Sequence, residues 1–155
     1  MGRKSTLIRF NLALGLWLTG TLLAQAQEPL FGTWKANPAR SQYSPGPVPR
    51  SNISKWEPFN GGVKLTVDSD TLHYEGSGKF DGRDNPVIGN NPDADTVAFS
   101  KIDAHTYESV NKKAGKTTIT SRIVVAADGK TRITTQTGKN AQGETVKITT
   151  FYEKQ

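Results

Sequence analysis

The chain offers few residues that could act as a catalytic base or nucleophile. Its only histidines are His73 and His105, and it has no cysteine. Alternation puts His73 and Glu75 on one face of a predicted strand, opposite Leu72 and Tyr74, so both should face solvent. His105 falls in a predicted turn. Since no Gly-x-Ser-x-Gly elbow is present either, nucleophilic hydrolysis has no support. We therefore expect no catalytic residue, no cofactor and no enzymatic activity.

Carboxylates are concentrated in and beside one long segment, at Asp81, Asp84, Asp93 and Asp95. Calcium favours oxygen ligands of this kind. The order of glycine and acidic positions does not match the regular calcium loop. We expect solvated turn carboxylates here and no metal site.

Aromatic side chains are the better candidates for a binding site, because flat apolar surfaces supply most of the contact for a small lipophilic molecule. Trp56 alternates opposite Ile53 and Lys55 on a predicted strand. Together with Tyr74 and Phe99 it is predicted to line a pocket. Ordinary core packing of these three rings is the alternative.

The elements that must position these residues are strands. Beyond Asn60, stretches rich in Thr, Val, Ile and aromatic residues are cut by Gly- or Asp-containing turns about every ten residues, which is typical of an antiparallel barrel or sandwich. Turns at Gly61-Gly62, Ala114-Gly115 and Asp128-Gly129 indicate hairpins between consecutive strands. The prediction is all-β, an antiparallel up-and-down β-barrel of about nine strands. The strands are expected at 31–35, 52–58, 62–68, 71–79, 95–101, 105–112, 116–126, 130–138 and 145–153.

Three connections are predicted to be distinctive. Asn37 followed by Pro38 resembles a helix start, so one short helical turn should extend to Tyr43. Residues 44–49 contain three prolines and should run extended across the surface. The segment Asp81–Asp93 is too long for a simple hairpin and is expected to cross one mouth of the barrel.

Alternation also predicts which side chains face inward. Beyond Leu72 and Tyr74, the inward face of the same strand continues with Gly76 and Gly78, and the strand with Ile133 continues with Thr135 and Thr137. These small side chains leave either a ligand cavity or the bends that a barrel needs. The other residues predicted to face inward are Val63, Leu65, Val67, Val97, Phe99, Ile119, Ile123, Val125, Val146 and Ile148.

The first residues are typical of a signal peptide. Arg3, Lys4 and Arg9 precede an apolar stretch at 10–23, and Ala24-Gln25-Ala26 has the form that signal peptidase cleaves. The apolar stretch is shorter than the ~20 residues of a membrane-spanning helix. We expect a cleaved signal over 1–26, a single domain over 27–155, an exported protein that is periplasmic or extracellular, and no stable membrane insertion after cleavage.

Charge argues against nucleic acid as a partner. The chain has 20 basic and 14 acidic residues; without Arg3, Lys4 and Arg9 the balance is 17 against 14, a net charge of +3. The remaining cations are dispersed. Lys130 and Arg132, beside one turn, are expected to keep a strand end soluble. A monomer without nucleic-acid binding is expected.

Two short motifs give a resemblance. Phe31-Gly32-Thr33-Trp34 near the start of the domain and a last strand ending Phe151-Tyr152-Glu153-Lys154 resemble the lipocalin and fatty-acid-binding (calycin) superfamily of ligand-binding barrels. The segments 80–87 and 128–131 resemble uncharacterised exported bacterial proteins of this size.

The resemblance implies roles for particular residues. Gly32 and Trp34 would close one end of the barrel, with the tryptophan as its plug. Fatty-acid-binding proteins hold a carboxylate with an Arg-x-Tyr motif, but the position two before Tyr152 is Thr150. A carboxylate held in that way is not expected, and the segment after the first strand is too short for their two-helix lid.

The functional prediction is non-catalytic binding of a small hydrophobic or amphipathic ligand in a lipocalin-like barrel. The alternative is a barrel filled with side chains that serves as an envelope or extracellular structural or interaction module.

Overall fold

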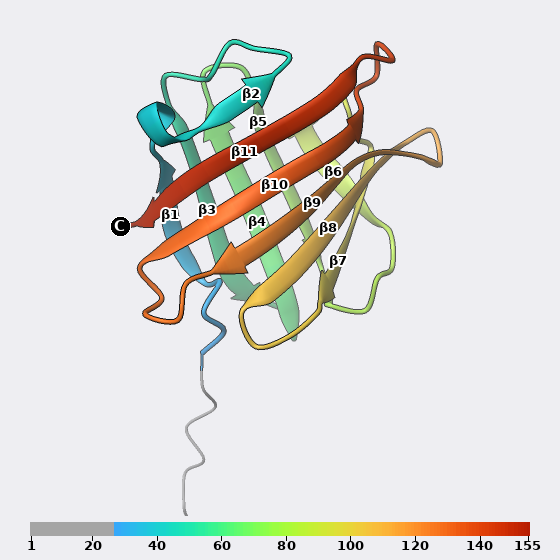
Figure 1. The fold of residues 1–155 in the computed structure, drawn as a ribbon. Coiled ribbons are helices and arrows are strands. Elements are labelled where there is room, and N and C mark those ends of the chain that lie inside the picture. The colour runs from blue at the N-terminus through green and yellow to red at the C-terminus, as the bar shows by residue number, and fades with distance from the viewer. Residues whose placement is uncertain (1–26) are drawn as a thin grey trace, which may run out of the picture.

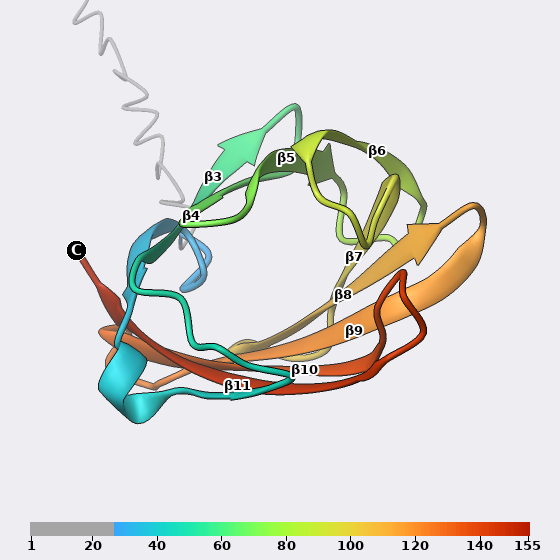
Figure 2. The same ribbon diagram turned by 90° about the horizontal axis from the view of Figure 1, so that it is seen from above.

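Eleven strands in the described residues 27–155 form one antiparallel sheet in this computed structural model, and the sheet closes into a barrel (Figures 1 and 2). The predicted signal peptide, 1–26, lies outside the described residues. The elements are β1 (Gly32–Ala36), a 3-10 turn η1 (Pro38–Arg40), β2 (Gln42–Ser44), β3 (Asn52–Phe59), β4 (Gly62–Ser69), β5 (His73–Gly78), β6 (Asn85–Asn90), β7 (Thr96–Lys101), β8 (Thr106–Lys113), β9 (Lys116–Val125), β10 (Thr131–Lys139) and β11 (Thr145–Lys154).

Closure depends on β1, which pairs with β3 on one side and with β11 on the other. Trp34 is level with Ser54 on β3 and with Lys154 on β11. β11 is longer than β1, and its first half pairs with β2 instead, where Tyr43 is level with Ile148. Ten strands thus form the ring and β2 lies outside it, which leaves few unpaired edges.

The predicted all-β, up-and-down barrel is confirmed, with ten ring strands and β2 in place of about nine. The helical turn predicted up to Tyr43 is limited to η1, and Tyr43 itself belongs to β2. The segment Asp81–Asp93 does not cross a mouth, because its middle part is β6, a wall strand that pairs with β5. Pro86 and Gly89 concealed this strand in the sequence, since both are unusual in central strands.

The two ends of the barrel differ. The mouth is the end formed by the Pro-rich segment 45–51 and by the turns at 70–72, 91–95, 114–115 and 140–144. The floor is the opposite end, where the chain enters at residues 27–31 (Figure 1). Figure 2 shows this first segment inside the outline of the ring.

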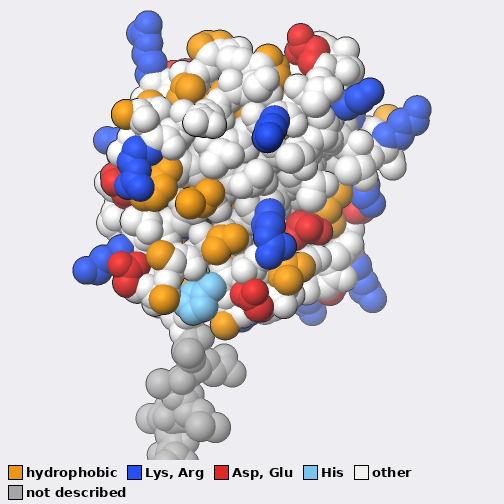
Figure 3. All heavy atoms as spheres, in the orientation of Figure 1, with side chains coloured by type: hydrophobic (Ala, Val, Ile, Leu, Met, Phe, Trp, Pro, Cys, Tyr) orange, Lys and Arg blue, Asp and Glu red, His pale blue; other side chains and the backbone are white. Residues whose placement is uncertain are grey.

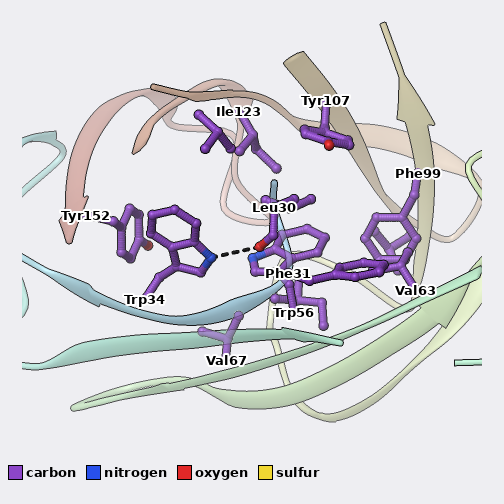
Figure 4. Packing of buried hydrophobic residues seen from close by; sticks show 13 residues of the cluster. Leu30, Phe31, Trp34, Trp56, Val63, Val67, Phe99, Tyr107, Ile123 and Tyr152 are labelled. Atoms are coloured by element: carbon purple, nitrogen blue, oxygen red, sulfur yellow. Dashed lines mark hydrogen bonds between the residues drawn. The ribbon is translucent and has the colours of Figure 1, made fainter. Parts of the chain in front are cut away.

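The entering segment is packed into the floor. Leu30 is fully buried, and its carbonyl oxygen accepts a 2.8 Å hydrogen bond from Nε1 of Trp34 (Figure 4). The carboxylate of Glu28 accepts hydrogen bonds from Tyr107 Oη at 2.6 Å and from Lys101 Nζ at 2.8 Å. The floor is therefore closed by apolar packing inside and by an ion pair at its rim.

On most strands the residues predicted to face inward do form the core. Val63, Val97, Phe99, Ile123 and Val125 are all buried in one apolar cluster with Trp34 and Trp56.

On β10 the predicted face is wrong. Ile133 is 45% exposed, and the inward side chains are Arg132, Thr134 and Gln136. The ladder explains this, because Arg132 is level with the buried residues Val125 and Tyr152 on its two neighbours.

Glu28 gives a test of the floor. Partial burial acts to raise the pKa of this carboxyl, but the hydrogen bonds from Lys101 and Tyr107 outweigh it and lower the pKa. A lowered pKa means that the charged form stabilises the fold above the usual glutamate range, and that this contribution is lost as the pH falls through the lowered pKa. Glu28→Gln should therefore reduce the free energy of unfolding at pH 7 by about 1 kcal/mol, and the difference from wild type should shrink in acid. Urea unfolding at a series of pH values measures it.

The matched control is Glu153→Gln, on the exposed outer face of β11. It should change stability little at any pH. A Glu28→Gln deficit that is independent of pH would contradict the proposed ion pair.

Candidate ligand-binding site

A cavity of about 80 Å³ lies inside the barrel around the side chain of Arg132. Arg132 is 3% exposed. It is the second residue of β10, and its side chain points into the barrel. The residues that line the cavity come from both halves of the wall. They are Asn52, Ser54, Trp56, Leu65, Val67, Leu72, Tyr74, Ser109, Asn111, Ser121, Ile123, Arg132, Thr134, Gln136 and Tyr152.

Aromatic rings surround the guanidinium. Its central carbon lies 4.1 Å from the ring centroid of Tyr152, 5.1 Å from that of Trp34 and 5.8 Å from that of Trp56. Nη2 donates a hydrogen bond to Ser54 Oγ. Cation–π contacts of this kind stabilise a desolvated cation by about 1–2 kcal/mol each. They hold the group in place without neutralising its charge.

The remaining donors of Arg132 are not used by the protein. Nε and Nη1 are buried, and no atom of residues 27–155 accepts a hydrogen bond from them. The indole Nε1 of Trp56 and the hydroxyl of Thr134, which line the same cavity, also lack partners within these residues. No aspartate or glutamate lines the cavity. Buried charges are normally paired, because an uncompensated one costs several kcal/mol.

Ionisation keeps this cavity positive. Burial lowers the pKa of Arg132 to about 10, with the phenols of Tyr152 and Tyr74 partly opposing the shift, so the guanidinium is charged at neutral pH. Burial raises the pKa of Tyr74 and of Tyr152, so both remain neutral phenols. The site therefore presents one fixed cation and several neutral polar groups.

A second cavity, of about 230 Å³, lies at the mouth. It shares Asn52, Leu72, Tyr74, Asn111 and Gln136 with the inner one, so the two adjoin. The outer cavity is covered on one side by three prolines of the Pro-rich segment, with apolar side chains of β11 nearby. These are Pro45, Pro47, Pro49, Val146 and Ile148.

The structure separates the three aromatic residues predicted to bind ligand. Trp56 and Tyr74 line the inner cavity. Phe99 packs edge-on against Trp56, with ring centroids 5.7 Å apart, and is not among the lining residues. The aromatic pattern alone could not distinguish them, because all three face inward.

The residues predicted to close the barrel lie in its floor half. Trp34 is fully buried beside Leu30. Gly32 has φ +136°, and a Cβ there would lie 2.5 Å from Cε of Lys154. The missing side chain lets Lys154 cross the floor, where its Nζ donates to the carbonyl of Pro29 at 3.3 Å.

The titratable residues considered for catalysis do not line either cavity. His73 is exposed with Nδ1 3.6 Å from Asp68 Oδ1, and Glu75 forms an ion pair with Lys64 at 2.9 Å. His105 belongs to a turn at the floor.

The aspartates of the long segment serve local structure. Asp84 pairs with Lys112 at 2.9 Å, Asp93 accepts from the backbone N–H of Ala141, and Asp95 accepts from that of Ala114. Within residues 27–155, no group of three or more His, Asp or Glu side chains is placed to hold a metal ion.

Arg132 is the residue that sequence reasoning missed. Its position beside the turn at Asp128-Gly129 predicts a soluble strand end instead. The available signal was that Arg132, Thr134 and Gln136 occupy alternate positions and therefore form a polar row on one face of the strand. Only the register with Tyr152 shows that this row faces inward.

No family model matches this chain, and no curated protein shows a significant match to it. Within the described part of the chain, no helix has the length and apolar character to cross a bilayer. The class that the fold and the cavity define is a closed antiparallel β-barrel with a cationic internal cavity.

The unpaired charge predicts an unusual stability effect. Arg132→Leu removes a buried cation that has no counter-charge, so the ligand-free protein should become more stable, by roughly 1–4 kcal/mol. Urea unfolding measures the change. Arg122→Leu is the matched control, since Arg122 is exposed on the outer face of β9 and its loss should have an effect within about 0.5 kcal/mol. Strong destabilisation by Arg132→Leu would show that the guanidinium is already satisfied.

Proposed function

We propose that this protein is an exported, monomeric, non-catalytic binding protein whose barrel takes up a small amphipathic molecule bearing one anionic group. The observation that carries the proposal is the buried guanidinium of Arg132, which has two donor nitrogens without a hydrogen-bond partner in residues 27–155 and lines a cavity without carboxylates. Export is supported by the signal-like sequence at 1–26.

An anion is the group that completes this environment. A carboxylate or sulfonate accepts from two guanidinium nitrogens at once, and such charge-assisted pairs are stronger than neutral hydrogen bonds. The aromatic rings and Ser54 already fix the position of Arg132. Binding therefore requires little reordering of the protein, which favours affinity.

The apolar part of the ligand has surfaces to contact. Trp56, Leu65 and Val67 line the inner cavity, and Leu72 lines both cavities. The prolines of the Pro-rich segment extend this surface at the mouth. An anion bound at Arg132 places the rest of the molecule between these residues and the mouth.

The resemblance to the lipocalin and fatty-acid-binding barrels supports an internal ligand, because a closed antiparallel barrel is common to them. The anion would be held differently. Arg-x-Tyr on one strand is absent, but Arg132 and Tyr152 are level on the adjacent strands β10 and β11. An arginine and a tyrosine are therefore present side by side here, but on two adjacent strands instead of one.

One feature favours the alternative of an interaction module. Val124 and Ile133 are cross-strand neighbours on the outer face of the barrel, and both are more than two-fifths exposed. On the face drawn in Figure 3, however, apolar, basic and acidic side chains are interspersed, with no large patch of one kind. The internal cation is the stronger observation.

The test compares two dyes of similar shape, anionic 8-anilinonaphthalene-1-sulfonate and neutral N-phenyl-1-naphthylamine. The full chain, expressed with its own leader, is titrated while dye and tryptophan emission are followed. The wild type should bind the sulfonate saturably, and Arg132→Gln should weaken it by at least about tenfold, because a charge-assisted pair is lost. Binding of the neutral dye should change less than about twofold.

Arg122→Gln is the matched control and should leave both affinities unchanged. Equal sulfonate affinity in wild type and Arg132→Gln would remove Arg132 from the site. Absence of saturable binding of either dye, and of any compound in solvent extracts of the purified protein, would favour the filled-barrel module.

A further inference from the structure

The two sides of the inner cavity differ in chemistry, and this deepens the proposed function by restricting the class of ligand. On the β4 side the lining is mainly apolar, with Leu65 and Val67 next to Trp56 of β3, although β3 also contributes Asn52 and Ser54. Across the barrel, β8, β9 and β10 contribute a polar lining, apart from Ile123. Its members are Ser109, Asn111, Ser121, Thr134 and Gln136. Figures 1 and 2 show β4 and β9 on opposite sides of the ring.

The polar side forms a row that begins at the cation. Arg132, Thr134 and Gln136 alternate along β10, so successive members are about 7 Å apart. The row continues to the mouth, since Gln136 and Asn111 line both cavities. Gln136 donates to Ser121 at 3.2 Å. Thr134 is more than nine-tenths buried, and its hydroxyl has no partner within residues 27–155.

An unbranched alkyl chain fits this lining poorly. It would offer no partner to the hydroxyl of Thr134, and a buried unpaired polar group costs about 1–3 kcal/mol. A site built to bond a ligand hydroxyl rejects analogues that lack it for the same reason. A ligand with oxygen substituents along one edge avoids this cost.

Size points in the same direction. The inner cavity of about 80 Å³ has room for several water molecules. That is comparable to an acid group with one ring, and a larger molecule such as the sulfonate dye would extend into the adjoining outer cavity.

We infer that the ligand is a compact ring acid that carries a hydroxyl group, with its acid on Arg132, its hydroxyl on Thr134 and one ring face on Trp56 and Leu65. A fatty acid is not the preferred ligand. This inference rests on the proposed function, since it requires the same cavity and the same cation.

Isothermal titration calorimetry on the full chain, expressed with its leader, tests the inference with four acids. They are cyclohexanecarboxylate, trans-4-hydroxycyclohexanecarboxylate, 4-hydroxybenzoate and decanoate. The two hydroxy acids should each bind at least about tenfold more tightly than cyclohexanecarboxylate and decanoate, which corresponds to one satisfied hydrogen bond.

Thr134→Val keeps the shape of the side chain and removes its hydroxyl. It should reduce the advantage of trans-4-hydroxycyclohexanecarboxylate over the parent acid to about twofold or less while leaving the parent acid unaffected. Thr134→Ser should retain the advantage. Thr135→Val, the outward neighbour, is the matched control and should behave as wild type.

The outcomes separate the two proposals. Tightest binding of decanoate, or hydroxy acids no better than the parent, would overturn the inference and leave amphipathic binding intact. Saturable binding of the sulfonate dye without binding of any of the four acids would do the same. Failure of all the acids and both dyes would overturn the proposed function itself.

Discussion

The structure depends on the closure of the barrel at β1, and this seam brings aromatic rings together around one buried guanidinium. Arg132 comes from β10, and its contacts are Tyr152 of β11, Trp34 of β1, and Ser54 and Trp56 of β3. β1 joins the sheet by pairing with both β3 and β11. The cation is thus held by the strands that convert an open sheet into a closed one. Closure and the candidate site are parts of the same arrangement.

Much of the fold could be predicted because local chemistry determines it. Turns such as Ala114-Gly115 and Asp128-Gly129 need positive φ, and both glycines adopt it, so these hairpins were visible in the sequence. β6 was missed because Pro86 and Gly89 weaken the strand pattern, although β5 supplies the pairing that holds it. The burial of Leu30 was missed because it depends on a contact with Trp34 rather than on any periodicity.

The site was less predictable because its central residue, Arg132, breaks the rule that charged side chains lie on the surface. An arginine after a turn normally faces solvent, and Ile133 next to it normally faces the core. On β10 the arginine faces inward and the isoleucine faces outward. The reason is that Arg132 pairs in register with Val125 and Tyr152, and this register determines which face is internal. The inward placement of Trp56 and Tyr74 was predictable because inward aromatic residues satisfy the usual alternation. The inward position of Arg132 depends on long-range register, whereas that of Trp56 and Tyr74 agrees with their residue type.

The asymmetry of the barrel determines how the proposed ligand would lie. The floor half is filled by Leu30, Trp34 and their apolar neighbours, and Glu28 at its rim is already paired with Lys101. The cavity-lining polar groups without a partner in residues 27–155 belong to Arg132 and Thr134 of β10 and to Asn52 and Trp56 of β3. An anion at Arg132 therefore lies at the deep end of the cavity, with the floor closed behind it. The rest of the molecule has room only toward the mouth, so it must enter acid group first and meet the polar row of β10 on one side and Trp56 and Leu65 on the other.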